Sequence, residues 1–156
     1  MIFIPYTEEN FETATSYLSV EEADEIIAGQ RNNSIWNGYD AGVKEAILNQ
    51  ASVAVDSALM YQGKKISSLQ LLKFPRMGVD EKVDEVSKKL PINIKYAVST
   101  ICVQYSNDKA FKNITQETIS KLNWTFKEST NDIGAEVLTF LKPLKATIVR
   151  IGTPNE

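Results

Sequence analysis

Four acidic side chains near the start of the chain are the first residues that could do chemistry: Glu21, Glu22, Asp24 and Glu25. Carboxylate oxygens are the ligands that hard divalent cations such as Ca²⁺ and Mg²⁺ prefer. Consecutive acids in the first turn of a helix, however, usually stabilise the positive end of the helix dipole. We therefore expect this group to begin a helix and expect no metal site.

Other components of a catalytic site are scarce. The chain has no histidine, so it can build neither a Ser-His-Asp triad nor an HExxH zinc site. The 7 glycines show neither GxGxxG nor GxxxxGK spacing, which excludes the common phosphate-binding loops. Cys102, the one cysteine, lies on an apolar stripe and is expected to be an inert thiol in a reducing compartment such as a cytoplasm. We expect no enzymatic activity and no cofactor.

A short segment combines basic and aromatic residues, as single-stranded DNA-binding surfaces do: Lys121, Trp124, Phe126 and Lys127. The formal net charge of −3 opposes strong binding to phosphates. We expect Trp124 and Phe126 to lie in the core or in an interface.

Charge is divided unequally along the chain. Residues 1–60 carry ten acids against two bases, a net charge of −8, and residues 61–156 carry fifteen bases against ten acids, a net charge of +5. If the two halves occupy different faces, copies of the chain can attract one another head to tail. The alternative is an ordinary solvated surface of mixed sign.

Capping signals predict two helices in the first half. Ser19 and Glu22 have the spacing of a capping box, which predicts a helix over 20–28. Asp40 precedes apolar residues spaced three and four apart, which predicts a helix over 41–60.

The second half contains two further helices and two strand-like segments. Pro91 suits the first turn of a helix over 92–107. A short helix follows Asp132 and ends at Pro143. The segments 119–126 and 147–151 are rich in β-forming residue types and predict strands.

The predicted fold is mainly α: a small bundle of three to four helices with a short β element and a strand-like C-terminal tail. We divide the chain into an N-terminal arm (1–18), a helical domain (19–146) that includes a loop over 63–89, and a tail (147–156). The acidic start of the arm is unlike a signal peptide, and no apolar run is long enough for a membrane span. We expect no membrane partner.

The order of several motifs resembles the head-tail connector proteins of tailed bacteriophages, which are often labelled DnaT-like single-stranded DNA-binding proteins. The resemblance covers about residues 15–151. It is carried by the segments 16–24 (SYLSVEEAD), Trp36, 44–48 (KEAIL), 72–79 (LKFPRMGV), 90–97 and 138–144. Phe74 departs from the family, in which tryptophan is more usual.

The resemblance implies a helical protein that assembles as a ring, commonly a dodecamer, in the neck of the virion. Its partners would be the portal protein above and a tail or neck protein below, and genomic DNA would pass through its channel without sequence readout. The competing function is a single-stranded DNA-binding module of phage replication, as the family label suggests.

Two groups of residues are expected to make the contacts of such an assembly. We expect the loop 63–89 to become ordered on assembly, because it is too long for a simple connection. The oligomer interface would use Phe74, Pro75, Arg76, Lys88 and Lys89, with Arg76 pairing with an acid or carbonyl of a neighbouring copy. Docking to the portal protein would use a strand formed by Thr147, Ile148, Val149, Arg150 and Ile151. The alternative for that strand is internal pairing with residues 119–127.

Overall fold

The computed structural model describes residues 2–77, 88–108 and 135–145. Three predictions fall outside the described residues: the strand over 119–126, the helix cap at Asp132 and the docking strand over 147–151. The helical domain and its loop are therefore described in part.

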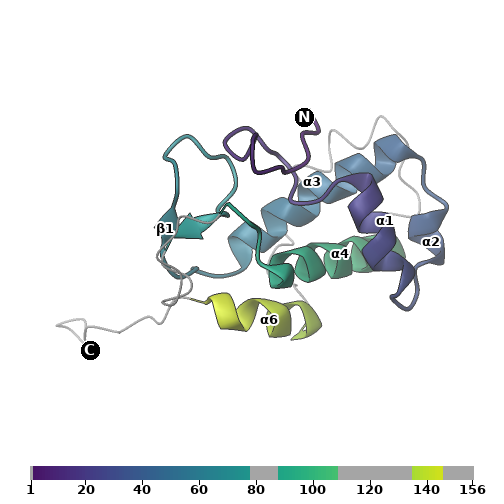
Figure 1. Ribbon diagram of the computed structural model, residues 1–156. Coiled ribbons are helices and arrows are strands. Elements are labelled where there is room, and N and C mark those ends of the chain that lie inside the picture. The colour runs from purple at the N-terminus through teal and green to yellow at the C-terminus, as the bar shows by residue number, and fades with distance from the viewer. Residues whose placement is uncertain (1, 78–87, 109–134, 146–156) are drawn as a thin grey trace, which may run out of the picture.

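The described chain is mainly α, which confirms the predicted fold class (Figure 1). Its elements are α1 (Val20–Ala28), α2 (Ser34–Asn37), α3 (Ala41–Ala58), β1 (Lys64–Lys65), β2 (Arg76–Met77), α4 (Ile92–Asn107), α6 (Ala135–Leu141) and the 3-10 helix η1 (Lys142–Leu144). No helix in these ranges is long and apolar enough to cross a membrane.

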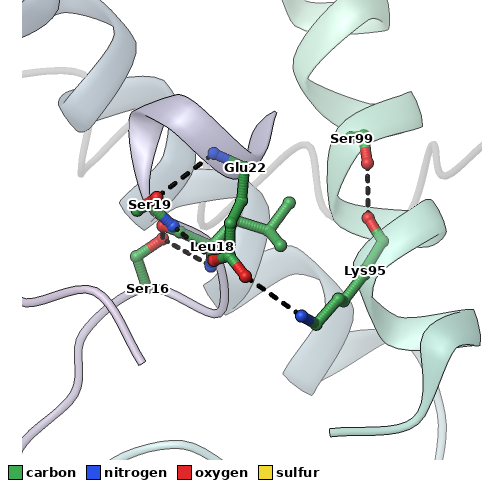
Figure 2. A network of polar contacts seen from close by, with 6 residues as sticks. All are labelled: Ser16, Leu18, Ser19, Glu22, Lys95 and Ser99. Carbon is green, nitrogen blue, oxygen red and sulfur yellow. Dashed lines mark hydrogen bonds and ion pairs between the residues drawn. The ribbon is translucent and has the colours of Figure 1, made fainter. Parts of the chain in front are cut away.

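Helix α1 begins at the predicted capping box. The Glu22 backbone N–H donates to Ser19 Oγ at 3.2 Å, and the Ser19 N–H donates to Glu22 Oε2 at 3.1 Å (Figure 2). Glu22 Oε1 also accepts a bond from Lys95 Nζ of α4 at 3.1 Å. One side chain therefore both caps α1 and joins it to α4.

Ser19→Ala should lower the free energy of unfolding by about 1 kcal/mol, because it leaves the Glu22 backbone N–H at the start of α1 without a side-chain partner. Urea denaturation followed by circular dichroism measures the change. Ser57→Ala, at an exposed serine on α3, is the matched control. An equal change in both variants would show that the capping box adds nothing.

Helices α3 and α4 form the centre of the bundle. Asp40 caps α3 by accepting the Val43 N–H at 2.9 Å, as predicted, and the helix ends at Ala58, two residues earlier than expected. The two helices pack through largely small, fully buried side chains such as Ala51 and Ala54 on α3 and Ala97 and Val98 on α4. Small side chains allow close approach of two helices, so these residues set the packing of the core.

Helices α1, α2 and α6 cover this pair. Trp36 of α2 is fully buried, and its Nε1 donates to Asp24 Oδ1 of α1 at 2.7 Å. Lys44 Nζ of α3 donates to the same carboxylate at 2.9 Å. Helix α6 packs along α4, and the chain continues from it directly into η1, which contains Pro143.

Cys102 is buried in α4, where burial raises the pKa of its thiol, which fits the expected inert role.

The N-terminal arm is packed onto the bundle. The Tyr17 N–H donates to Ser52 Oγ of α3 at 3.0 Å, and Thr15 Oγ1 lies 2.9 Å from Asn49 Oδ1. Tyr17 and Leu18 are fully buried. These contacts place the start of the chain beside α3, which matters for the loop described next.

Candidate functional site

The loop between α3 and α4 contains ordered structure where the sequence predicted a segment that orders on assembly. Strands β1 and β2 pair antiparallel, with Lys64 opposite Met77 and Lys65 opposite Arg76. Residues 63–77 make a set of contacts within the single chain that satisfies much of the loop backbone. Ordering of the whole loop 63–89 on assembly stays a prediction.

Arg76 holds the two ends of this hairpin together. Its Nε donates to the Gln62 carbonyl at 2.7 Å, Nη2 donates to the Gly63 carbonyl at 2.6 Å, and Nη1 donates to the Lys73 carbonyl at 3.3 Å. A planar guanidinium with five donors suits several carbonyls at once. Gly63 adopts a φ of 71°, a conformation that glycine favours, so its carbonyl can turn toward the guanidinium.

Phe74 anchors the loop in the core. Its ring is fully buried and stands edge-on to Tyr61, with centroids 4.8 Å apart, and to Tyr17, with centroids 6.4 Å apart. The bond from Phe74 to Pro75 is cis. These aromatic contacts join the loop to α3 and to the N-terminal arm.

Asp56 of α3 binds the backbone beside Phe74. Its carboxylate accepts the Lys73 N–H at 3.0 Å and the hydroxyl of Tyr17. The Tyr17 hydroxyl in turn accepts the Phe74 N–H at 3.1 Å. Burial raises the pKa of Asp56 to about 6, although these hydrogen bonds and the nearby cations Lys73 and Lys65 oppose the rise.

Gln70 shapes the tip of the loop from inside. It is 3% exposed; its Oε1 accepts the Ser67 N–H at 3.0 Å, and its Nε2 donates to the carbonyls of Leu72 and Pro75, each at 3.1 Å. The Leu71 N–H donates to the carbonyl of Glu12 in the arm at 3.2 Å. Gln70 therefore supplies hydrogen-bond partners to the loop backbone from inside the loop, and the Leu71 N–H joins the loop to the arm.

Three large apolar side chains on this segment nevertheless face solvent. Met60, Leu69 and Leu71 are 68%, 71% and 63% exposed. Leu69 and Leu71 lie two residues apart on one loop, and neighbouring exposed apolar side chains are typical of protein interaction sites. Sequence reasoning missed the two leucines, because nothing in the pattern shows that the polar Gln70 between them points inward.

Cations gather around this loop at one end of the molecule, at the side of Figure 1 where β1 lies. The Gln62 N–H donates to the Leu144 carbonyl at 2.9 Å, and the backbones of Tyr61 and Lys145 pair as an isolated antiparallel β-bridge. Helix η1 therefore lies beside the hairpin. We call the basic residues of these segments the basic end. They are Lys64, Lys65, Lys73, Arg76, Lys142 and Lys145. Two acids also lie here, since Glu12 accepts a bond from Ser67 and Asp56 accepts one from Lys73, so this end carries a net excess of cations.

Acids gather at the opposite end, where α1, α2 and the start of α3 lie (Figure 1). We call them the acidic end: Glu21, Glu22, Asp24, Glu25, Asp40 and Glu45. Arg31 is an exposed cation of the same region. Helix α3 has 18 residues, so about 27 Å separates its two ends. That exceeds the screening length of about 8 Å at physiological salt, so each end acts as a separate electrostatic surface.

Lys88 and Lys89 lie apart from the basic end, beside the N-terminal arm. Lys88 Nζ stands 5.0 Å from the centre of the Phe11 ring, and the Tyr6 hydroxyl donates to the Lys88 carbonyl. Lys89 and Lys95 line a cleft of about 370 Å³ together with acids and aromatic residues of the arm and α1. The surroundings of Lys88 and Lys89 are therefore mixed in charge.

The expected interface residues divide into two kinds. Phe74 and Pro75 are buried, and Arg76 is bonded to carbonyls of its own chain, so in the single chain these three hold the loop. Lys88 and Lys89 are exposed. An interface role for all five stays a prediction, as does docking through residues 147–151.

Within the described ranges, no group of three or more potential ligands is arranged to hold a metal ion. Two acids of α1 make contacts within the chain instead. Glu22 caps the helix and pairs with Lys95. Asp24 pairs with Lys44 and accepts a hydrogen bond from Trp36 Nε1. The alternative of a cation site there has no geometric support among these residues.

Comparison with known proteins identifies a family. A family described as "Putative DnaT-like ssDNA binding protein" matches residues 4–150 of the 156. No curated protein and no solved structure matches the chain. The match confirms the family label stated from the motifs, and the chain belongs to the family described as "Putative DnaT-like ssDNA binding protein".

Proposed function

We propose that this chain is a structural subunit that assembles into a ring, as in the head-tail connectors of tailed phages. The observation that carries the proposal is the separation of charge into a basic end and an acidic end. A ring of identical copies needs a heterologous interface, in which each copy presents two different surfaces. Complementary potentials on those surfaces favour head-to-tail contact and oppose head-to-head contact.

The finer parts of the proposal come from the family resemblance. The ring is a dodecamer in the neck of the virion, made in the host cytoplasm and bound to the portal protein and to a tail or neck protein. Genomic DNA passes through its channel without sequence readout. The subunit acts without catalysis and without a cofactor.

Single-stranded DNA binding is the second candidate, and the family description favours it directly, since that description names this function and names neither a ring nor a portal. The basic end supplies exposed cations for phosphates, such as Lys64, Lys142 and Lys145. Base stacking needs exposed aromatic rings. Tyr61 and Phe74, the described aromatic residues of that end, are both buried.

Two measurements on the purified full chain separate these functions. Under the ring proposal, analytical ultracentrifugation and negative-stain images show closed rings, alone or with portal protein added. A fluorescent single-stranded oligonucleotide then shows no binding that exceeds the binding of duplex DNA of equal length. Salt-sensitive binding that prefers the single strand, by a chain that forms no ring, would establish the second function instead.

A further inference from the structure

We propose that the exposed leucine pair of the hairpin loop, Leu69 and Leu71, docks on the acidic end of a second copy of this chain. The inference rests on the proposed ring function and assigns its interface. The basic residues beside the loop would face the acids of α1 and α3 in the neighbour.

The loop has the properties of a docking element. Its backbone and polar side chains are bonded to their own chain through Arg76, Gln70 and Asp56. A surface already held in one conformation loses little conformational entropy when it binds. Leu69 and Leu71 project from this rigid frame and leave apolar area exposed to water.

The acidic end offers a matching surface. Ile26 of α1 and Val43 of α3 are half-buried apolar side chains there, and Glu25 and Glu45 flank them in sequence and carry exposed or half-exposed carboxylates. The ion pair from Lys44 Nζ to Asp24 Oδ1, at 2.9 Å, joins the two helices at this place. An apolar centre with a charged rim is the usual arrangement of a protein interface.

Charge complementarity identifies the occupant as a second copy. The surface that matches a basic rim is an acidic one, and the chain itself carries such a surface about 27 Å away along α3. Contact between unlike ends leaves the pair of copies with one free basic end and one free acidic end, so further copies can add, and a ring forms when the rotation between neighbours closes.

The test reverses charge at each end separately and then at both. The first variant carries Lys64→Glu and Lys145→Glu, and the second carries Glu25→Lys and Glu45→Lys. None of these four side chains makes a hydrogen bond or an ion pair that the described structure shows, so folding should be preserved; circular dichroism checks this. Assembly is measured by analytical ultracentrifugation over a range of salt concentrations.

Each variant alone should need at least about tenfold more protein for half-assembly, since its substitutions remove most of the charge of one end and place repelling charges in the contact. An equimolar mixture of the two should assemble with alternating subunits, because each contact then joins either two natural ends or two reversed ends, and the charges of the exchanged residues are complementary in both. The chain with all four substitutions should assemble more readily than either variant alone, because its exchanged residues are again opposite in charge across each contact. Failure of both rescues in folded proteins would overturn the assignment.

The leucine contact has its own test. Leu69→Ser with Leu71→Ser should weaken assembly even at high salt, where charge is screened, while Ile2→Ser, at an exposed apolar residue of the arm, should not. Unchanged assembly of the leucine variant would overturn the proposal.

A variant with Lys88→Glu and Lys89→Glu distinguishes this interface from the one predicted from the sequence. Loss of rings in that variant but not in the Lys64 and Lys145 variant would place the contact beside the arm. In that outcome the ring function stands and the interface proposed here is wrong. If the natural chain forms no assembly and binds single-stranded DNA, the function and the interface both fail.

Discussion

Phe74→Ala should lower the free energy of unfolding by about 3–5 kcal/mol, the usual cost of removing a buried phenylalanine ring. The ring is fully buried and makes edge contacts with Tyr61 and Tyr17. Its removal leaves a cavity at the point where the loop, α3 and the arm meet. Urea denaturation measures the loss.

Phe140→Ala is the matched control, because Phe140 of α6 is only half-buried. Its substitution should cost clearly less. If Phe74→Ala keeps full stability in the single chain and prevents assembly, then Phe74 acts between copies, as the sequence suggested, and its anchoring role described here is wrong.

The second large effect is a dependence of stability on pH that originates at Asp56. The pKa of this carboxyl is raised to about 6 in the folded chain, against about 3.8 for an unfolded chain. Between these values the folded state binds more protons than the unfolded state. Stability therefore rises as the pH falls from about 7 to about 4, by up to about 3 kcal/mol for this group.

Asp56→Asn should remove that rise, because an amide does not titrate and its oxygen can still accept the Lys73 N–H. The measurement compares the free energy of unfolding of the natural chain and the variant at several pH values in this window. Glu45→Gln, at a carboxyl outside this buried network, is the control and should leave the difference in place. Parallel curves for the natural chain and Asp56→Asn would contradict the assignment.

The two effects bear on assembly through the same loop. Asp56 and Phe74 hold residues 73–75 in place, and Arg76 joins the two ends of the hairpin. Loss of the Asp56 contact or of the Phe74 contact should therefore free Leu69 and Leu71 from their positions. Ordering a mobile loop costs conformational entropy on binding. Variants that loosen the loop should therefore assemble less readily even though they leave both charged ends unchanged.

The helices were predictable from the sequence because their signals are local. Ser19 and Glu22 lie three residues apart, and Asp40 and Val43 likewise, so each cap is complete within one helical turn. The bounds of α1 and α4 agree with the predicted ranges, and the motifs shared with the family were recognisable for the same reason.

The tertiary structure alone decided what the loop and the charges do. Phe74 meets Tyr17 across 57 residues, and Lys73 meets Asp56 across 17, so no local pattern distinguishes an anchor in the core from an exposed contact. The basic end likewise joins the hairpin to η1, about eighty residues later in the chain. The sequence determined that the chain carries two charged halves. Only the folded path of the chain determined which of these charges lie apart and which meet, because the distance between charges depends on that path. Helix α3 places about 27 Å between the basic end and the acidic end, whereas Lys95 of the second half pairs with Glu22 of the first.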